Sequence, residues 1–119
     1  MALENTHYGH ARIGEMLKDC RSIFFIGIGG ISMSALAQIS RSLGYDVGGS
    51  DRSENAQTEH LKGMGIPVFP SHDAKNVAQY DAVIYTVAIG ADNPEYLAAK
   101  AAGKPLFSRA DYLGYLMVS

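Results

Sequence analysis

A glycine-rich segment is the first feature of the sequence that could do chemistry. Gly27, Gly29 and Gly30 follow an apolar run, and Ser32 and Ser34 lie just beyond them in a helical pattern. Glycines permit a tight turn and close approach of a ligand, and the following helix offers unpaired N–H groups and a positive dipole end. The segment predicts a phosphate-binding turn, with a purely structural turn as the alternative. Because Ser32 replaces the third glycine of the G-x-G-x-x-G fingerprint, an ordinary dinucleotide site is less favoured.

A carboxylate follows at a suitable distance. Asp51 comes about 20 residues after the glycines, at the end of the next predicted strand, where an acidic residue commonly accepts hydrogen bonds from ribose hydroxyls. This spacing indicates a nucleoside ligand but does not separate the ribose of adenosine from that of uridine. The alternative is that Asp51 caps the next helix.

Two further segments would border the same site. Thr86, Ala88 and Ile89 follow the fourth predicted strand, across the switch point where ligands bind in open α/β sheets. Thr86 offers a hydroxyl and the other two offer backbone groups, whereas a plain strand-to-loop transition is the alternative. His72 is a lone histidine, and such a residue is more often a surface or capping residue than part of a site.

The sequence shows no pattern of a catalytic or metal-binding site. Its four histidines and one cysteine lack metal-ligand spacing, and neither a Ser–His–Asp set nor a catalytic carboxylate pair is visible. Gly103-Lys104 is followed by Pro105, not by the Ser or Thr of an ATP-binding P-loop. We therefore predict no catalytic residue and no metal in this chain.

Alternating strand and helix patterns supply the elements that would position these residues. One helical pattern spaces Ile31, Ala35, Ile39 and Leu43 by four and ends at Gly44. The alternation predicts an α/β fold, a Rossmann-like doubly wound parallel sheet of about five strands with helices on both faces. We expect an N-terminal helical arm at 1–21 and the sheet domain at 22–119. Apolar, β-branched or aromatic runs predict the strands at 22–26, 45–51, 67–70, 82–87 and 104–107.

Composition limits the class of protein. The chain has 119 residues, 47% of them hydrophobic, and a net charge of −2, as expected for one globular domain. The mild acidity argues against a nucleic-acid partner. The absence of a long apolar run or a signal peptide argues against a membrane partner and for the cytoplasm. The single Cys20 cannot form an intrachain disulfide, which suits the same compartment.

The glycine-rich segment and five further stretches resemble the Mur ligase family. The resemblance implies an ATP-dependent, three-domain ligase of bacterial peptidoglycan synthesis that joins L-alanine to UDP-N-acetylmuramate. It implies that this chain is the N-terminal domain that binds the UDP part, without the central ATP domain and the C-terminal domain, and is not catalytic alone. Only the full-length enzyme would need ATP and Mg²⁺. The matching stretches, at 25–34, 43–45, 49–51, 72–77, 92–95 and 109–110, span about 22 to 117.

The resemblance also implies a role for each residue of the UDP site. The amides of residues 29–32 would hold the diphosphate after the turn at Gly27, Asp51 would meet the uridine, and His72 would lie by the uracil pocket. Ser32 and Ser71 stand where family members usually have glycine, and Ser32 adds a hydroxyl near the phosphates. The residues assigned to the site are Gly27, Gly29, Gly30, Ile31, Ser32, Asp51, His72, Thr86, Ala88 and Ile89.

Three alternatives remain beside this expectation. A related muramate ligase that attaches a recycled tripeptide to the same UDP sugar shares these motifs. A regulatory NAD-binding Rossmann module has similar length and an acidic residue after its second strand, although the Ser-Met-Ser after the double glycine disfavours it. The last alternative is an interaction or dimerisation domain with an empty crevice.

Overall fold

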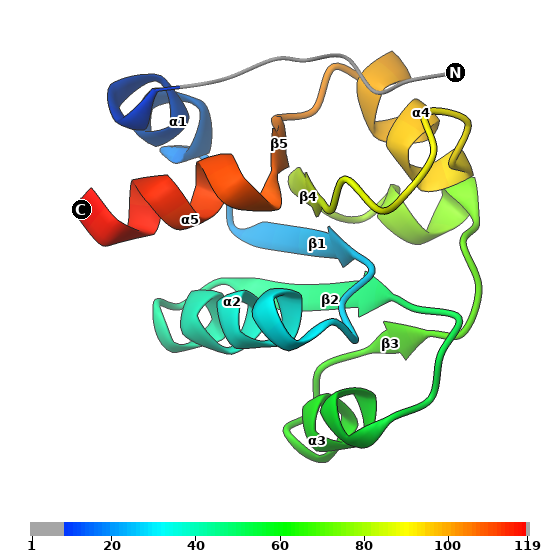
Figure 1. The fold of residues 1–119 in the computed structure, drawn as a ribbon. Helices are drawn as coiled ribbons and strands as arrows, with labels where there is room; N and C mark the ends of the chain where they lie inside the picture. Colours follow the sequence, from blue (N-terminus) through cyan, green and yellow to red (C-terminus); the bar gives the residue numbers. More distant parts are fainter. Residues whose placement is uncertain (1–8, 119) are drawn as a thin grey trace.

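Five parallel strands form one sheet in the computed structural model, which describes residues 9–118 (Figure 1). Along the sheet the order is β3-β2-β1-β4-β5, so β1 lies in the centre and the chain winds outward from it in both directions. This is the doubly wound arrangement that the strand–helix alternation predicts. The strands are β1 (Ser22–Ile26), β2 (Asp46–Ser50), β3 (Val68–Phe69), β4 (Ala82–Tyr85) and β5 (Leu106–Ser108).

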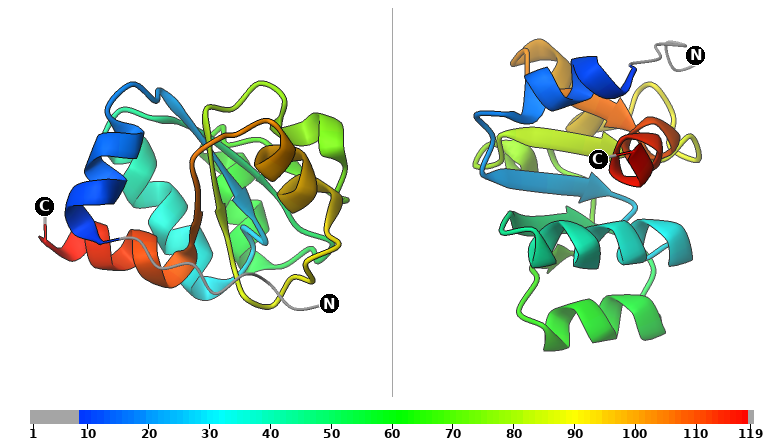
Figure 2. Two further views of the ribbon diagram at one scale, coloured as in Figure 1. Left: turned by 90° about the horizontal axis from the view of Figure 1, so that it is seen from above. Right: turned by 90° about the vertical axis from the view of Figure 1, so that its left-hand side faces the viewer.

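Helices cover both faces of this sheet (Figures 1 and 2). α2 and α5 pack over one face, α1 lies against α5, and α3 lies beside α2 near the β3 edge. α4 and the short 3-10 helix η1 pack over the other face. The helices are α1 (His10–Leu17), α2 (Ile31–Ser42), α3 (Ala56–Gly63), η1 (Ala74–Val77), α4 (Pro94–Ala101) and α5 (Arg109–Val118).

The central strand explains the continuous apolar run in the sequence. Every residue of β1 is buried, because successive side chains point to opposite faces and each face has its own core. Ile23 and Phe25 join the core beneath α2 and α5. Phe24 and Ile26 join the core beneath α4 and η1.

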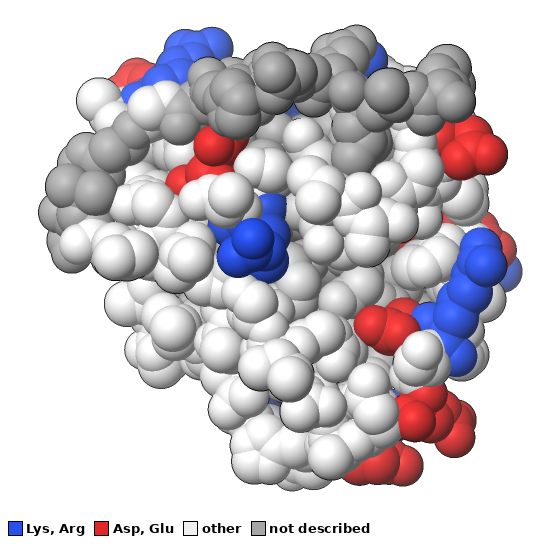
Figure 3. Space-filling view, viewed as in Figure 1, with Lys and Arg blue, Asp and Glu red and all other residues white. Residues whose placement is uncertain are grey.

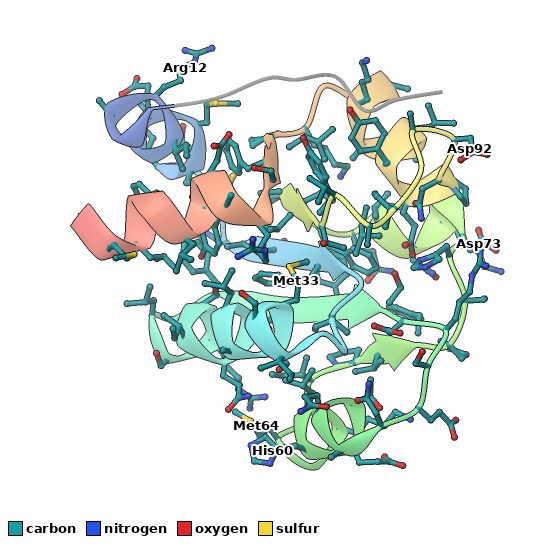
Figure 4. All side chains as sticks on the ribbon, viewed as in Figure 1. Arg12, Met33, His60, Met64, Asp73 and Asp92 are labelled. Carbon is teal, nitrogen blue, oxygen red and sulfur yellow. The ribbon has the colours of Figure 1, made fainter. Side chains whose placement is uncertain are left out.

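The predicted helix is confirmed as α2, but the row of residues spaced by four is not its buried face. Ile31 and Leu43, at the two ends of that row, are 79% and 59% exposed, and Ala35 and Ile39 are exposed as well. The helix turns Met33, Leu36, Ala37 and the small Ser34 and Ser40 inward instead. In Figure 4 Met33 lies on the side of α2 that faces α5. The inward face includes two small polar residues: Ser34 donates to the Ile31 carbonyl at 3.0 Å within the helix, and Ser40 has a partner far along the chain.

Tyr112 is that partner for Ser40. Its side chain is 0% exposed, its hydroxyl lies 2.6 Å from Ser40 Oγ, and its ring meets Phe25 edge-on at 6.2 Å. Ser40 Oγ also donates to the Leu36 carbonyl at 2.8 Å. The two hydroxyls therefore join α2 to α5 inside the apolar core.

We expect Tyr112 to make the fold sensitive to alkali. Burial raises the pKa of Tyr112 to about 12, against an ordinary 10 in the unfolded chain. Below pH 10 both states keep the proton, and as the pH rises toward 12 the unfolded state ionises first, so stability falls, by about 2 to 3 kcal/mol in total. Urea unfolding between neutral and alkaline pH should show this loss in the wild type and a smaller loss in Tyr112→Phe. Equal losses in the two proteins would contradict the assignment.

The face of the molecule that Figure 3 shows carries few charged groups. In the view of Figure 3 most of the described surface is uncharged, and the Lys and Arg side chains form separate groups, not a continuous stripe. No helix within residues 9–118 is long and apolar enough to span a membrane.

Cys20 is partly buried. Its burial raises the pKa of the thiol, and the nearby Asp81 and Asp19 raise it further. The thiol is therefore protonated at neutral pH and serves in packing.

Candidate functional site

The glycine-rich turn is anchored to the end of β2. Gly27 has φ +84°, a conformation that side chains rarely adopt, and its N–H donates to the Ser50 carbonyl at 2.8 Å. Ile28 N–H donates to the same oxygen at 3.0 Å, and Gly30 N–H closes the turn on the Gly27 carbonyl at 3.2 Å. The turn thus has a defined shape before any ligand is considered, at the carboxyl ends of β1 and β2.

Asp51 reaches into this turn. Its Oδ2 accepts the Gly29 N–H at 2.8 Å, and its Oδ1 accepts the Ser53 N–H at 2.8 Å. The Asn55 side chain donates to the Gly29 carbonyl at 3.2 Å and caps α3 in a reciprocal capping box with Thr58. The alternative that Asp51 caps the next helix is therefore wrong, because Asn55 does so.

Two amides at the start of α2 face no protein acceptor. Gly30 is the N-cap residue and has no side chain that could accept a hydrogen bond from the first amides of the helix. The first helical hydrogen bond runs from Ser34 N–H to the Gly30 carbonyl at 2.8 Å. The N–H groups of Ile31 and Ser32 therefore have no hydrogen bond within the described residues. Of the four amides assigned to the diphosphate, those of Gly29 and Gly30 already have partners inside the protein, and the other two are available.

A cation stands beside these amides. Arg109, the first residue of α5, donates from Nη1 to Ser32 Oγ at 3.2 Å. The hydroxyl of Ser32 thus receives a guanidinium hydrogen bond at the N-terminus of α2. This role of Arg109 was not predicted, because nothing in the local pattern of the sequence indicates that the start of α5 approaches the start of α2.

A cavity of about 400 Å³ opens next to the turn. Thr86 is not among the residues that line it, but its Cγ2 lies only 3.1 Å from where a Cβ on the lining residue Gly27 would stand. The loop after β4 curls back, since Ile89 N–H donates to the Thr86 carbonyl at 3.2 Å. In Figure 4, Asp92 and Asp73 mark the side of the molecule to which β1 and β2 point. The cavity is lined by Gly27, Asp51, Arg52, His72, Ala88, Ile89, Gly90, Asp92, Asn93 and Pro94.

A buried polar network supports His72 in this cavity. Glu95, fully buried at the start of α4, lies with Oε1 2.8 Å from His72 Nδ1 and 2.5 Å from Ser50 Oγ. Its Oε2 accepts from Asn76 Nδ2 at 2.8 Å. The structure thus gives His72 a fixed place in a network. In the sequence, Glu95 is only an acidic residue in the first turn of a helix, a position that the helix dipole alone explains.

The predicted site residues therefore gather at one edge of the sheet. Gly27, Asp51, His72, Ala88 and Ile89 line the cavity. The remaining ones are in the glycine-rich turn, at the start of α2 or, for Thr86, directly after β4, and they do not line the cavity. The charges are mixed, with Asp51 and Asp92 as acidic groups and Arg52 as the one cation among the lining residues.

Most of the chain is similar to proteins of one known family. Residues 22–119 match the family described as Mur ligase family, catalytic domain. A UDP-N-acetylmuramate–L-alanine ligase of Caldicellulosiruptor bescii is 51% identical over 94 residues, which are 79% of this chain and 21% of that protein. The enzyme of the same name from a Psychrobacter species is 45% identical over 101 residues, 85% of this chain and 21% of that protein. The chain thus spans about a fifth of the length of these curated relatives.

Two solved structures share the fold. The UDP-N-acetylmuramate–alanine ligase of Thermotoga maritima superposes with a TM-score of 0.74 at 43% identity, over 77% of this chain and 21% of that one. The UDP-N-acetylmuramate:L-alanyl-γ-D-glutamyl-meso-diaminopimelate ligase of Neisseria meningitides gives a TM-score of 0.71 at 27% identity, over 78% of this chain and 30% of that one.

Proposed function

Because this chain belongs to the Mur ligase family, we propose that it binds the uridine diphosphate part of UDP-N-acetylmuramate for a ligase that adds L-alanine. The observation that carries the proposal is the free N-terminus of α2 beside the cavity. The unpaired amides of Ile31 and Ser32, with Arg109 next to them, suit a diphosphate. Asp51 and His72, on the same cavity, suit the nucleoside.

Each predicted residue has a part in this proposal. The amides of Ile31 and Ser32 bind phosphate oxygens, and Gly30 keeps the approach clear of side chains. The missing Cβ of Gly29 leaves room for Asp51, whose Oδ2 would lie 2.7 Å from it. Asp51 accepts a ribose hydroxyl with the lone pairs that its backbone hydrogen bonds leave free. Ala88 and Ile89, in the loop that follows Thr86, line the same cavity as His72 and would contact the nucleoside.

L-Alanine is favoured over a tripeptide as the second substrate of the parent enzyme. The support is the higher identity to the alanine ligases, 43% for the solved structure against 27% for the tripeptide enzyme. In the parent enzyme, ATP and Mg²⁺ would act outside the fifth of the relatives' length that these residues match. We therefore expect no ATP-dependent ligation by these 119 residues alone, and release of ADP on addition of substrate would contradict that expectation.

A thermal-shift titration with four ligands tests the proposal. UDP-N-acetylmuramate and UDP should each raise the unfolding temperature, whereas NAD and ATP should not. At 100 times its dissociation constant, a ligand that binds only the folded state stabilises by about 2.7 kcal/mol. A shift with NAD alone would favour a dinucleotide module, and no shift with any ligand would refute nucleotide binding by this chain.

A further inference from the structure

Glu95 is a carboxylate with no exposure to solvent and with three hydrogen-bond donors. Ser50 comes from the end of β2, His72 from the loop after β3, and Asn76 from η1. Both Glu95 side-chain oxygens are engaged, and no buried side-chain nitrogen or oxygen in the described chain lacks a partner. This set of bonds joins three separate segments at the rim of the cavity. Glu95 itself contacts neither the diphosphate amides nor Asp51 in the bonds described above, so its role must lie in what it does to its three partners.

The network determines which nitrogen of His72 carries the proton. An ionised carboxylate only accepts, so the Nδ1 that lies 2.8 Å from Glu95 Oε1 must donate to it. Ser50 Oγ lies 2.5 Å from the same carboxylate oxygen and 2.9 Å from His72 Nδ1. Because its one hydroxyl proton goes to the nearer carboxylate oxygen, Ser50 Oγ is a second acceptor for Nδ1 and not a donor to it. In the neutral ring Nδ1 therefore holds the proton and Nε2 is a bare acceptor.

The bare nitrogen is the one left to a ligand. The side chain of His72 is 11% exposed against 0% for Glu95, and His72 lines the cavity. Because Nδ1 is taken by the network, any ligand that meets the ring edge meets Nε2. A ligand hydroxyl would gain nothing from a fixed tautomer of His72, since it rotates to donate or to accept. A ligand group that can only donate a hydrogen bond would bind better to a bare Nε2 than to a protonated one.

We propose that Glu95 is a positioning residue that selects the base of the ligand by holding His72 as an acceptor. The proposal rests on the proposed binding of uridine diphosphate and explains how the site would distinguish uracil from other bases. The imide N3–H of uracil is a fixed donor and suits a bare Nε2. Cytosine presents an unprotonated N3 at the same place, so two acceptors would face each other, and CDP would bind more weakly than UDP.

Glu95→Gln should reverse this arrangement. Asn76 donates to the Ser71 carbonyl at 3.0 Å as well as to Glu95 Oε2, so its NH₂ group is held in place. A glutamine must therefore turn its carbonyl toward Asn76 and its NH₂ toward His72. Nδ1 then becomes the acceptor, and the proton moves to Nε2.

The first measurement needs no ligand. Long-range proton–nitrogen NMR of ¹⁵N-histidine protein, at about pH 8 where an ordinary histidine is neutral, reports which ring nitrogen carries the proton. His72→Phe identifies the signals. We expect a protonated Nδ1 and a bare Nε2 in the wild type, and the reverse in Glu95→Gln. A wild-type proton on Nε2 would overturn the proposal, even if Glu95→Gln fails to fold.

The second measurement compares the dissociation constants of UDP and CDP. We expect the preference for UDP over CDP to fall about tenfold in Glu95→Gln, which is about 1.4 kcal/mol. Asp81→Asn is the matched control, because it makes the same change from acid to amide away from the cavity. Asp81 accepts the Arg21 N–H at 2.8 Å at the amino ends of β1 and β4. An unchanged ratio in folded Glu95→Gln would overturn base selection. If the wild type binds neither nucleotide, the proposed function fails and base selection with it, while the NMR result still decides whether Glu95 sets the tautomer.

Discussion

Gly30→Val should remove most of the affinity for UDP and leave the free energy of unfolding almost unchanged. Gly30 is exposed and has φ −68° and ψ 151°, an extended conformation that valine adopts readily. A Cβ on Gly30 would meet nothing closer than the Gly27 carbonyl oxygen at 3.7 Å and Met33 Cβ at 3.9 Å. The protein therefore has room for the substitution.

A bound diphosphate would not have room beside a valine at position 30. A diphosphate bound to the amides of Ile31 and Ser32 must pass next to Gly30, and a branched side chain there would hold it away. We expect the dissociation constant of UDP to rise about a hundredfold in Gly30→Val, or about 2.7 kcal/mol, and less in Gly30→Ala. Gly63→Ala, where a Cβ would meet nothing within 4 Å, is the control on α3. Unchanged UDP affinity in folded Gly30→Val would show that the turn is structural.

Gly49→Ala should have the largest effect on stability. Gly49 pairs with Phe25 across β1 and β2, and its Cβ would lie 2.5 Å from the Phe25 carbonyl oxygen and 2.7 Å from Ile28 Cβ. Neither atom can move away without disturbing the central strand or the turn. We expect a loss of about 3 kcal/mol in urea unfolding, the upper part of the range for an overpacked core.

Gly48→Ala provides the matched comparison on the other face of β2. There the Cβ would meet the hydroxyl end of Tyr80, whose ring packs edge-on against Phe24 at 5.2 Å. Tyr80 is only partly buried, so its ring can swing outward. We expect a loss of about 1 kcal/mol. Equal losses at the two glycines would contradict the idea that backbone contact makes Gly49 special.

The features that the sequence predicted correctly, namely the fold class and the positions of the strands, depend on patterns of neighbouring residues. The run at β1, the glycines after it, and Asp51 about 20 residues later place a turn and a carboxylate together, and Asp51 indeed bonds to Gly29. These positions follow from strand length and from the geometry of one strand–helix–strand unit. Local pattern also explains why the fold class was predictable with no knowledge of the ligand.

The features that were missed depend on residues far apart in the chain. Glu95 draws its three donors from positions 19, 23 and 45 residues away, so no window around it reveals that it is buried. Ser40 is buried because Tyr112, 72 residues later, meets its hydroxyl. In both cases a polar residue lies inside because a distant partner satisfies it, and hydrophobic periodicity does not detect such pairs.

The two outer strands have a consequence for aggregation. An open sheet leaves a row of unpaired backbone groups at each side, which another chain can extend. Here β3 has two residues and β5 has three. Proline, which has no N–H to donate, stands before each of them as Pro67 and Pro105, and Pro70 follows β3. Neither side therefore offers a long template for intermolecular strand addition, and the folded protein should resist cross-β association even at high concentration.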